Sequence, residues 1–427
     1  MAYIRPFRGI RYNPAVVGDP QALVCPPYDV ISERQQARLH SQSPYNAIHL
    51  DLNQAAERYT TAAELWRSWR EKRVLIQEPE PALYVYSQDF SLPDGSLRRR
   101  TGILAAVRLE EFASGVIRPH EQTFEDAKKD RLALLEACQA QLSPVFLLYA
   151  RKDWSIEQVL AGELAEPIIA VSDGQANRHT VWRVTDPVRI AEVAAGLAAE
   201  SLIIADGHHR YETALRYCRE HPGAPPDAAL RYVLAYVTNA EDEGVVILPT
   251  HRLIHDAPLP SVDALRTVFS RDFRLRLYPR NRTAEFFAAL GDAATDSERR
   301  VGCALAGARH YWLLCFDERI HRGSNRSAAL RSVDVTVLHD VLLQRVLGFT
   351  PEQQEATVSY TSSTQEALQA VIEQRCQAAF FLNPTPYDQV QQVCGGGETM
   401  PHKSTYFYPK LLTGLVFYSL AAGAGGG

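Results

Sequence analysis

Residues 202–215 read Leu-Ile-Ile-Ala-Asp-Gly-His-His-Arg-Tyr-Glu-Thr-Ala-Leu. A short apolar run ends in Asp-Gly, two histidines and an arginine follow, and then a helical pattern begins. This order predicts a buried strand, a tight turn and the N-terminus of a helix. A helix N-terminus attracts phosphate or carboxylate, because it presents free backbone N–H groups and the positive end of the helix dipole. We therefore expect an anion-binding site at this turn.

The turn concentrates groups that can do chemistry. Gly207 lets the backbone approach a ligand closely, and Arg210 would bind two phosphate oxygens with its planar guanidinium. His208 or His209 would donate or shuttle a proton near neutral pH. Asp206 would orient a histidine or hold Mg²⁺ through its oxygen atoms. The alternative is a strand, turn and helix whose polar groups only cap the helix.

Length and composition are those of a globular protein with more than one domain. The 427 residues are 46% hydrophobic and 22% charged, which is ordinary for folded domains. We expect a catalytic domain over residues 1–255 and a C-terminal α+β domain over residues 256–427. The loop at 400–412 is expected to return to the catalytic site.

Other classes of protein are disfavoured by charge and cysteine usage. The formal net charge is −5 and the basic residues are dispersed, so the stripe that nucleic acid needs is missing. The seven cysteines are odd in number and have no CxxC spacing, which argues against a disulfide framework and a structural zinc site. We see no signal peptide and no apolar run of membrane-spanning length, and expect a cytoplasmic protein with a small-molecule substrate. The oligomeric state is not indicated.

Several strands are expected, with polar groups where they end. Residues 83–90 and 99–109 predict a hairpin, and residues 145–149, 202–206 and 232–239 predict buried strands. Asn239 ends one of these strands, and His251 follows another at 245–248. Strand ends of this kind converge on one crevice in layered α/β architectures. We therefore expect Asn239 near the turn, whereas a lone His251 is more often a hydrogen-bonded loop residue.

A second set of candidates lies on a loop and the helix after it. His120 and Glu121 occupy the loop, and Glu121 is our candidate general base for a substrate hydroxyl. Lys128 and Arg131 follow at a spacing that puts both cations on one helix face. They would contact phosphate or nucleotide; the alternative is a solvated surface.

The third set lies near the C-terminus. Residues 400–410 read Met-Pro-His-Lys-Ser-Thr-Tyr-Phe-Tyr-Pro-Lys. Lys403 with the hydroxyls of Ser404 and Thr405 makes a chemically sensible phosphate contact on the side opposite the turn. The alternative is a C-terminal segment that docks on the core.

Eight segments spread over nearly the whole chain resemble the bacterial and archaeal DUF1015 family. They are residues 4–12, 26–31, 43–46, 119–121, 129–132, 205–211, 248–252 and 403–412. The family label names no activity. Genes of this family are often found near those of phosphorylated serine biosynthesis, which points to serine or phosphoserine.

The turn at residues 206–210 is also similar to the nucleotide-handling turn of the ParB/sulfiredoxin-like group. That group includes CTP-binding partition proteins, ATP-using sulfiredoxins and nucleotide-dependent free-serine kinases. In the serine kinases an Asp-Gly-His-His-Arg turn contacts the phosphates and a separate Glu acts as base. The resemblance implies an α+β fold with mixed sheets and helices: a ParB/sulfiredoxin-like core with large insertions, plus a C-terminal α+β region. Sulfur chemistry is disfavoured, because His208 and His209 stand where sulfiredoxin needs its cysteine.

Together these features predict phosphoryl transfer or phosphoester hydrolysis on a small polar metabolite, with serine or phosphoserine favoured. The expected cofactors are Mg²⁺ and a nucleoside di- or triphosphate. One alternative is a divalent-metal hydrolase using Asp206, His208, His209 and His120, although adjacent histidines at a helix start do not share a face. The other is a nucleotide-gated binding protein in the manner of partition proteins, although no DNA-reading helix is recognisable.

Overall fold

The computed structural model describes all residues except 154, 161–163, 165, 293–297 and 422–427. The chain forms two compact units. The first unit comprises residues 1–119, 123–246 and 409–427, and the second comprises residues 120–122 and 247–408. The sequence placed the boundary near residue 255 and assigned the C-terminal residues to the second domain.

A mixed nine-stranded sheet forms the centre of the first unit, in the order β6-β11-β8-β12-β5-β4-β10-β9, with β1 paired to β5. The predicted hairpin is confirmed as β4 (Leu83–Ser91) and β5 (Leu97–Arg108). The buried strands are confirmed as β8 (Val145–Tyr149), β11 (Leu202–Asp206) and β12 (Tyr232–Asn239). The remaining strands of this sheet are β1 (Ile4–Arg5), β6 (Ile117–Arg118), β9 (Ile169–Ser172) and β10 (Arg178–Val184).

Strand direction overturns one expectation. β12 runs parallel to β8, but β11 runs antiparallel to it, so that Asp206 pairs with Phe146 and Asn239 pairs with Tyr149. The carboxyl ends of β11 and β12 therefore lie at opposite edges of the sheet. The expectation that Asp206 and Asn239 share one crevice is wrong, because that rule holds for parallel strands.

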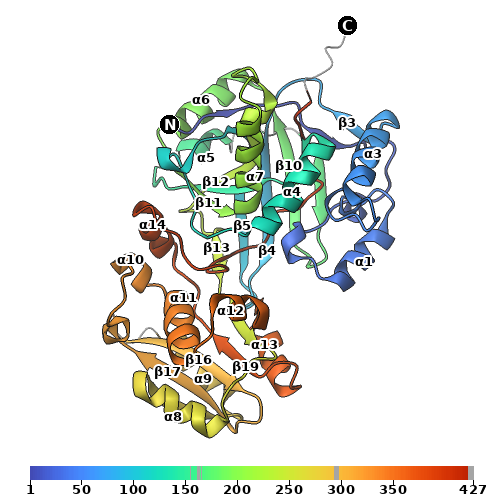
Figure 1. Ribbon diagram of the computed structural model, residues 1–427. Helices are drawn as coiled ribbons and strands as arrows, with labels where there is room; N and C mark the ends of the chain where they lie inside the picture. The colour runs from blue at the N-terminus through green and yellow to red at the C-terminus, as the bar shows by residue number, and fades with distance from the viewer. Residues whose placement is uncertain (154, 161–163, 165, 293–297, 422–427) are drawn as a thin grey trace. The chain divides into compact units, whose positions relative to one another are not determined.

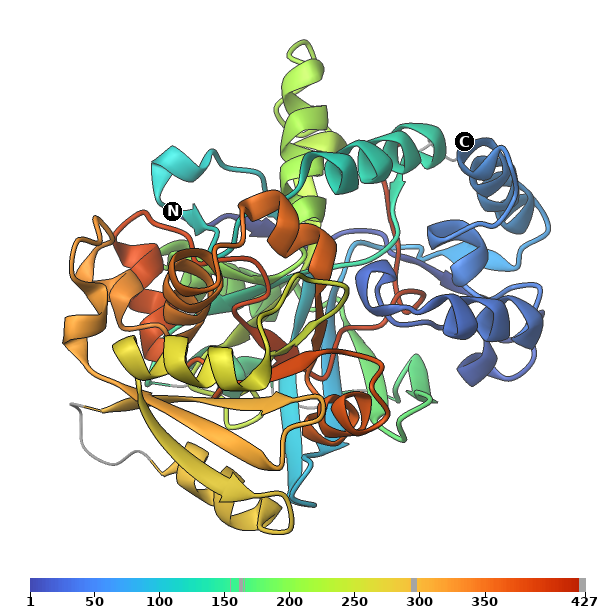
Figure 2. The ribbon, with the colours of Figure 1, turned by 60° about the horizontal axis from the view of Figure 1, so that its bottom comes forward.

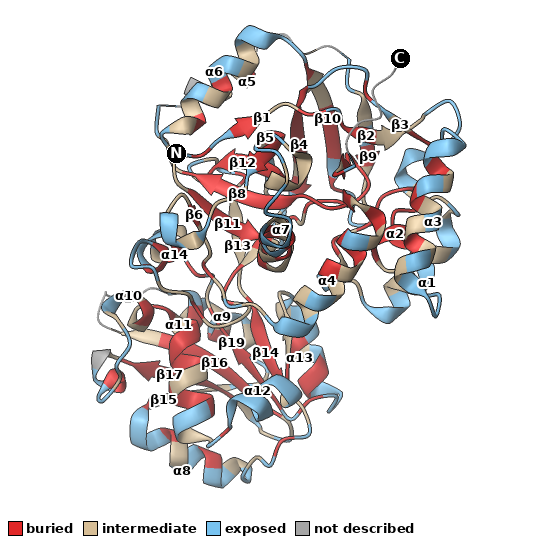
Figure 3. Ribbon diagram, turned by 45° about the horizontal axis from the view of Figure 1, so that its top comes forward, coloured by how far each residue is buried: buried red, intermediate tan, exposed pale blue. Residues whose placement is uncertain are grey.

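Helices and two apolar cores support this sheet. Side chains of β8, β11 and β12 pack with those of α7 in one core. These three strands are buried along their whole length (Figure 3). The other core joins α2, α3 and α4 near the N-terminus. Helices α4 and α7 pack against each other (Figures 1 and 2). Ser32 caps α1, accepting from the backbone N–H of Gln35. The helices are α1 (Glu33–Gln42), α2 (Ile48–Asp51), α3 (Arg58–Glu71), α4 (Glu125–Cys138), α5 (Ser155–Leu160), α6 (Pro187–Ala198) and α7 (His208–Glu220).

Short elements complete the first unit. Strand β2 (Ile10–Tyr12) pairs with β3 (Leu75–Gln77), and β7 (Ala140–Gln141) pairs with β21 (Tyr418–Ser419). The single-turn 3₁₀ helices are η1 (Pro20–Ala22), η2 (Tyr28–Val30), η3 (Phe112–Ser114) and η4 (Ala229–Arg231).

The second unit has a six-stranded antiparallel sheet, in the order β15-β17-β16-β19-β14-β18. Its strands are β14 (His251–Ile254), β15 (Arg274–Pro279), β16 (Arg299–Leu305), β17 (His310–Phe316), β18 (Val358–Thr361) and β19 (Ala378–Phe381). His251 begins a strand, and the expectation that it lies in a loop is wrong. Two short strands are β13 (Val246–Leu248) and β20 (Tyr406–Tyr408).

The helices of the second unit include a π-helix. They are α8 (Val262–Asp272), α9 (Thr283–Gly291), η5 (Glu318–His321), α10 (Ala328–Arg331), α11 (Asp334–Thr336), the π-helix η6 (Val337–Val346), α12 (Pro351–Thr357), α13 (Thr364–Ile372) and α14 (Tyr387–Gly395). The chain thus has an α+β fold with mixed sheets and helices, as predicted. None of the helices in the described ranges is long and apolar enough to cross a membrane.

Candidate functional site

The predicted strand, turn and helix are confirmed around Gly207. Asp206 is the last residue of the wholly buried β11, and His208 is the first residue of α7. Gly207 lies between them with φ of 87°, in the left-handed region that glycine adopts without strain. A Cβ at this position would lie 2.9 Å from Nη2 of Arg210. The turn therefore needs a glycine both for its backbone and for the arginine beside it.

Asp206 holds two cations at this helix N-terminus. Its Oδ2 accepts from Nη2 of Arg210 at 2.7 Å, and its Oδ1 pairs with Nζ of Lys410. Arg210 also donates through Nη1 to the carbonyl of Pro144. The side chains of Arg210 and Lys410 are each 12% exposed, so water screens these charges little. Arg210 and Lys410 thus place two cations beside this carboxylate, where the helix dipole is also positive.

The segment that carries Lys410 is fixed by two buried side chains of the β4–β5 hairpin. Arg100 donates through Nη2 to the carbonyl of Pro409 at 2.6 Å, and Gln88 donates through Nε2 to the carbonyl of Lys410 at 3.1 Å. Arg100 itself is fully buried, with its guanidinium 4.6 Å from the ring centroid of Phe146. These two bonds fix the backbone that carries Lys410, which restricts where its ammonium group can lie.

The sequence did not single out Lys410. It lies inside the 400–412 loop, but the hydroxyls beside Lys403 drew attention to that residue instead. The signal was the residue type: a lysine in a segment expected to reach the turn can pair with a carboxylate there.

The two histidines have different surroundings. His208 is buried in the first turn of α7. His209 accepts from the backbone N–H of Phe124 through Nε2 at 3.0 Å, and its ring stacks on that of Phe124 with centroids 6.3 Å apart. An accepting Nε2 means that a neutral His209 carries its proton on Nδ1.

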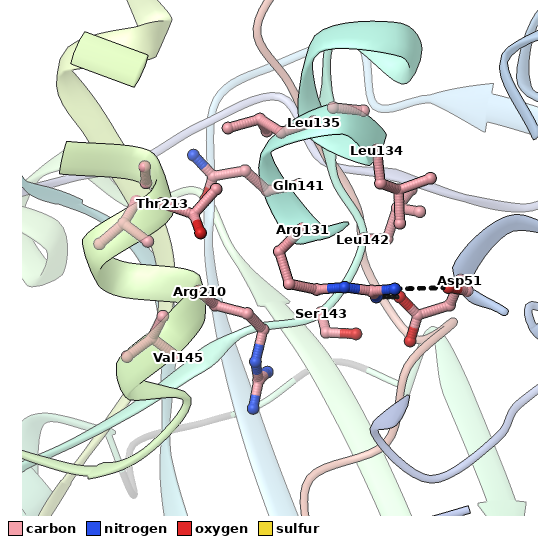
Figure 4. A pocket seen from close by; sticks show the side chains of 13 residues that line it. Asp51, Arg131, Leu134, Leu135, Gln141, Leu142, Ser143, Val145, Arg210 and Thr213 are labelled. Atoms are coloured by element: carbon pink, nitrogen blue, oxygen red, sulfur yellow. Dashed lines mark hydrogen bonds and ion pairs between the residues drawn. The ribbon is translucent and has the colours of Figure 1, made fainter. Parts of the chain in front are cut away.

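On α4, the two predicted cations are paired with carboxylates. Nζ of Lys128 lies 2.6 Å from Oε1 of Glu125 and 3.1 Å from Oε2 of Glu212. Nη1 of Arg131 donates to Oδ1 of Asp51 at 2.8 Å. Burial raises the pKa of Asp51, while the guanidinium of Arg131 lowers it. Arg131 and Asp51 line a small pocket together with Arg210, so Arg131 lies near the turn (Figure 4).

Asn239 serves a turn at the other edge of the sheet. Its Oδ1 accepts from the backbone N–H of Arg151 at 3.1 Å and of Glu241 at 3.2 Å, and its Nδ2 donates to the carbonyl of Arg151 at 2.7 Å. These bonds satisfy the hydrogen-bonding groups of the buried side-chain amide. The burial of Asn239 is therefore explained without a ligand.

The remaining candidates cluster in the second unit. Nε2 of the fully buried His120 lies 2.7 Å from Oγ1 of Thr405. Oε1 of Glu121 accepts from the backbone N–H of Thr405 at 3.1 Å and from its hydroxyl at 3.3 Å. Ser404 donates its hydroxyl to the carbonyl of Pro401 at 2.6 Å. Hydrogen bonds to Thr405 therefore join the loop at 120–121 to the segment at 404–405.

Arg252 completes that cluster, and sequence reasoning assigned it no role. It is fully buried, donates through Nη2 to the carbonyl of Lys403 at 2.9 Å, and lies 5.4 Å from the ring centroid of Tyr360. Burial lowers the pKa of Arg252 to about 10, although the neighbouring Tyr360 and Glu121 raise it. Lys403 itself has φ of 56°, an uncommon value for a residue with a side chain.

His251 is a structural histidine. Its Nε2 lies 2.9 Å from the hydroxyl of Thr364, and its Nδ1 accepts from the backbone N–H of Leu382 at 3.4 Å. Burial, with the charge of Arg252, lowers the pKa of His251 to about 4. The side chain is therefore neutral near pH 7.

The structure thus divides the candidates between the two units. The first unit holds Asp206, Gly207, His208, His209, Arg210, Arg131, Lys128 and Asn239, and the second unit holds His120, Glu121, Lys403, Ser404 and Thr405. Within the described ranges, no group of three or more His, Cys, Asp or Glu side chains is arranged to hold a metal ion.

Comparison with curated proteins finds no match. Among solved structures, the chain is similar to "Free serine kinase in complex with AMP", with 12% identity, 70% of this chain and 88% of that chain covered, and a TM-score of 0.35. It is also similar to a conserved hypothetical protein from Pyrococcus furiosus, with 14% identity, coverages of 69% and 90%, and a TM-score of 0.34. For "SbnI with C-terminal truncation from Staphylococcus aureus" the identity is 11%, the coverages are 73% and 85%, and the TM-score is 0.35.

These structural likenesses are too weak to carry an argument, and the ParB/sulfiredoxin-like core stays a prediction from residues 206–210. The sequence comparison is decisive for the family. Residues 4–336 match the family described as "Protein of unknown function (DUF1015)", and this chain belongs to that family.

Proposed function

We propose that this protein catalyses nucleotide-dependent phosphoryl transfer to a hydroxyl group of a small polar metabolite. The observation that carries the proposal is the pair of cations, Arg210 and Lys410, that Asp206 holds at the N-terminus of α7. Phosphoryl transfer needs mainly positioning and neutralisation of the phosphate charge. The likeness of residues 206–210 to the turn of free-serine kinases favours serine as the acceptor.

The proposed phosphate ligands act from several directions. The backbone N–H groups at the N-terminus of α7 would donate to phosphate oxygens, and the helix dipole favours the negative charge. Lys410 adds a point charge and Arg210 a planar guanidinium, and both are partly desolvated. An incoming phosphate would be attracted by both cations and by the helix dipole.

Within the first unit, proton transfer is assigned to the histidines of the turn. His209 presents its Nδ1 proton as a donor, because its Nε2 accepts from Phe124. His208 is the second candidate donor in the same turn. Glu121, the base expected from the sequence, belongs to the second unit, where its carboxylate accepts two hydrogen bonds from Thr405, and its role stays a prediction from the sequence.

Direct binding of Mg²⁺ to Asp206 does not fit this geometry. Each oxygen of the carboxylate pairs with a cation, Oδ1 with Lys410 and Oδ2 with Arg210. We therefore propose that any Mg²⁺ comes with the phosphates of the nucleotide, as is common for a metal that keeps several waters. Lys128 pairs with carboxylates, and the side-chain amide of Asn239 is hydrogen-bonded to backbone groups. We therefore propose no phosphate contact for either residue.

Phosphorus NMR of a mixture of the protein, Mg²⁺, L-serine and either ATP or ADP tests this function. We expect a phosphomonoester signal of phosphoserine, with L-alanine as the control acceptor that lacks a hydroxyl. Release of inorganic phosphate without phosphoserine would assign hydrolysis instead, and no change in either nucleotide would contradict the proposal. The His208→Ala and His209→Ala variants should keep the fold and lose the activity.

A further inference from the structure

A small pocket of the first unit contains two buried charged atoms whose bonding capacity is unused (Figure 4). Asp51, Arg131 and Arg210 line the pocket together with apolar side chains that include Leu134 and Leu142. Its volume is about 50 Å³. The pocket shares Arg210 with the turn at the start of α7, so the two sites are adjacent.

The unused atoms belong to groups of opposite charge. Oδ1 of Asp51 accepts from Arg131, whereas Oδ2 of Asp51 has no hydrogen-bond partner in the part of the chain that the structure describes. Both Nη atoms of Arg210 have acceptors, whereas its Nε has none among the described residues. Asp51 is only 5% exposed. Buried polar groups in native proteins are almost always satisfied, so an acceptor and a donor left over in one pocket indicate a ligand.

The charges of the two unused atoms indicate what kind of ligand. Asp51 pairs with Arg131, and Arg210 pairs with Asp206. The unused atoms belong to one carboxylate and one guanidinium, so a ligand that bonds to both needs a cationic donor and an anionic acceptor. A zwitterion carries both groups and adds no net charge to the pocket. Its ammonium would donate to Oδ2 of Asp51, and its carboxylate would accept from Nε of Arg210.

The volume of the pocket limits the size of the ligand. A volume of about 50 Å³ is well below the roughly 300–1,000 Å³ of pockets for drug-sized ligands. It holds about three to five water molecules at roughly 10–15 Å³ each. We propose that this pocket binds the ammonium and carboxylate groups of a small α-amino acid. The inference rests on the proposed function, for which it assigns the acceptor class and the residues that recognise it.

Calorimetric titration with L-alanine, ethylamine and propionate tests the pocket directly. L-alanine carries both charged groups but no hydroxyl, so its binding does not depend on any phosphoryl transfer. We expect L-alanine and L-serine to bind at least tenfold more tightly than ethylamine, which lacks the carboxylate, and propionate, which lacks the ammonium. Equal affinity for all of these compounds, or no binding of either amino acid, would overturn the proposal.

Asp51→Asn keeps the shape of the side chain and removes its charge, and should weaken L-alanine binding at least tenfold. Glu78→Gln is the matched control, because Glu78 is another buried carboxylate paired with arginines, Arg11 and Arg183, and lies outside this pocket. Wild-type affinity for L-alanine in Asp51→Asn would overturn the proposal.

If Asp51→Asn does not fold, Ala214→Val fills the pocket without touching a charge, and the same tenfold loss is expected. Unchanged binding in Ala214→Val would again overturn the proposal. A separate titration with ADP distinguishes this pocket from the proposed function. L-alanine binding without ADP binding would contradict the function and leave the pocket supported, and the reverse result would contradict the pocket alone.

Discussion

Replacing Gly207 by alanine tests how firmly the turn holds its arginine, and Gly95 provides a matched control. Gly207 has φ of 87° and Gly95 has φ of 84°, so alanine is equally strained at both positions. That strain costs about 1–2 kcal/mol for an L-residue. No described heavy atom lies within 4 Å of a Cβ built at Gly95, so Gly95→Ala should lose only this amount.

At Gly207 the new methyl group meets the guanidinium of Arg210, with contacts of 2.9 Å to Nη2 and 3.0 Å to Cζ. An arginine side chain usually moves aside at little cost. Here Asp206 and the carbonyl of Pro144 hold both Nη atoms, and a lost hydrogen bond to a charged group costs about 1.5–3 kcal/mol. The expected loss of unfolding free energy for Gly207→Ala is therefore about 2.5–5 kcal/mol.

Urea unfolding of the two variants and the wild type at pH 7 measures the difference, provided that the m-value is unchanged. Titration with ADP should show weaker binding in Gly207→Ala and wild-type binding in Gly95→Ala. Losses of stability that agree within about 0.5 kcal/mol would refute the reasoning. Arg210 would then be free to move, and the pairing with Asp206 would not organise the turn.

Three further outcomes are expected. Arg210→Lys should weaken ADP binding at least tenfold at fixed salt, because lysine keeps the charge but not the planar donors; wild-type affinity would argue against this role. Glu121→Gln should lower kcat for phosphoryl transfer and leave KM for the nucleotide nearly unchanged, and an unchanged kcat would remove Glu121 as the base. Burial lowers the pKa of His251 from 6.5 to about 4, so between these pH values the unfolded chain binds a proton that the folded chain does not. Stability should fall as the pH drops through this window, by up to about 3 kcal/mol, and His251→Gln should reduce the fall; equal acid sensitivity of both proteins would contradict this.

The sequence predicted local structure well where pattern and turn chemistry agreed. The run that ends in Asp206, the glycine after it and the helix that follows were predicted from their order alone. The hairpin around Gly95 followed from its alternation and its turn. These features depend on neighbours in the chain, and local preferences are enough to determine them.

The arrangement of the strands could not be predicted in the same way. An apolar run indicates a buried strand but not its direction beside a neighbour. Asp206 and Asn239 were therefore expected together and are found at opposite edges of the sheet.

The role of Lys410 depends on a contact between residues 204 positions apart. It also depends on Arg100, which belongs to a run of three arginines. In β5 that side chain is fully buried and binds the segment that carries Lys410.

Titration of ADP against the wild type, Lys410→Met and Lys129→Met tests the central claim most directly, which is that nucleotide phosphates bind at the N-terminus of α7. Lys129 is a matched control, because it is a 68% exposed lysine of the same unit whose ion pair is with Asp126. We predict at least tenfold weaker ADP binding in Lys410→Met and wild-type binding in Lys129→Met. Wild-type affinity in Lys410→Met, with the fold intact, would contradict the account.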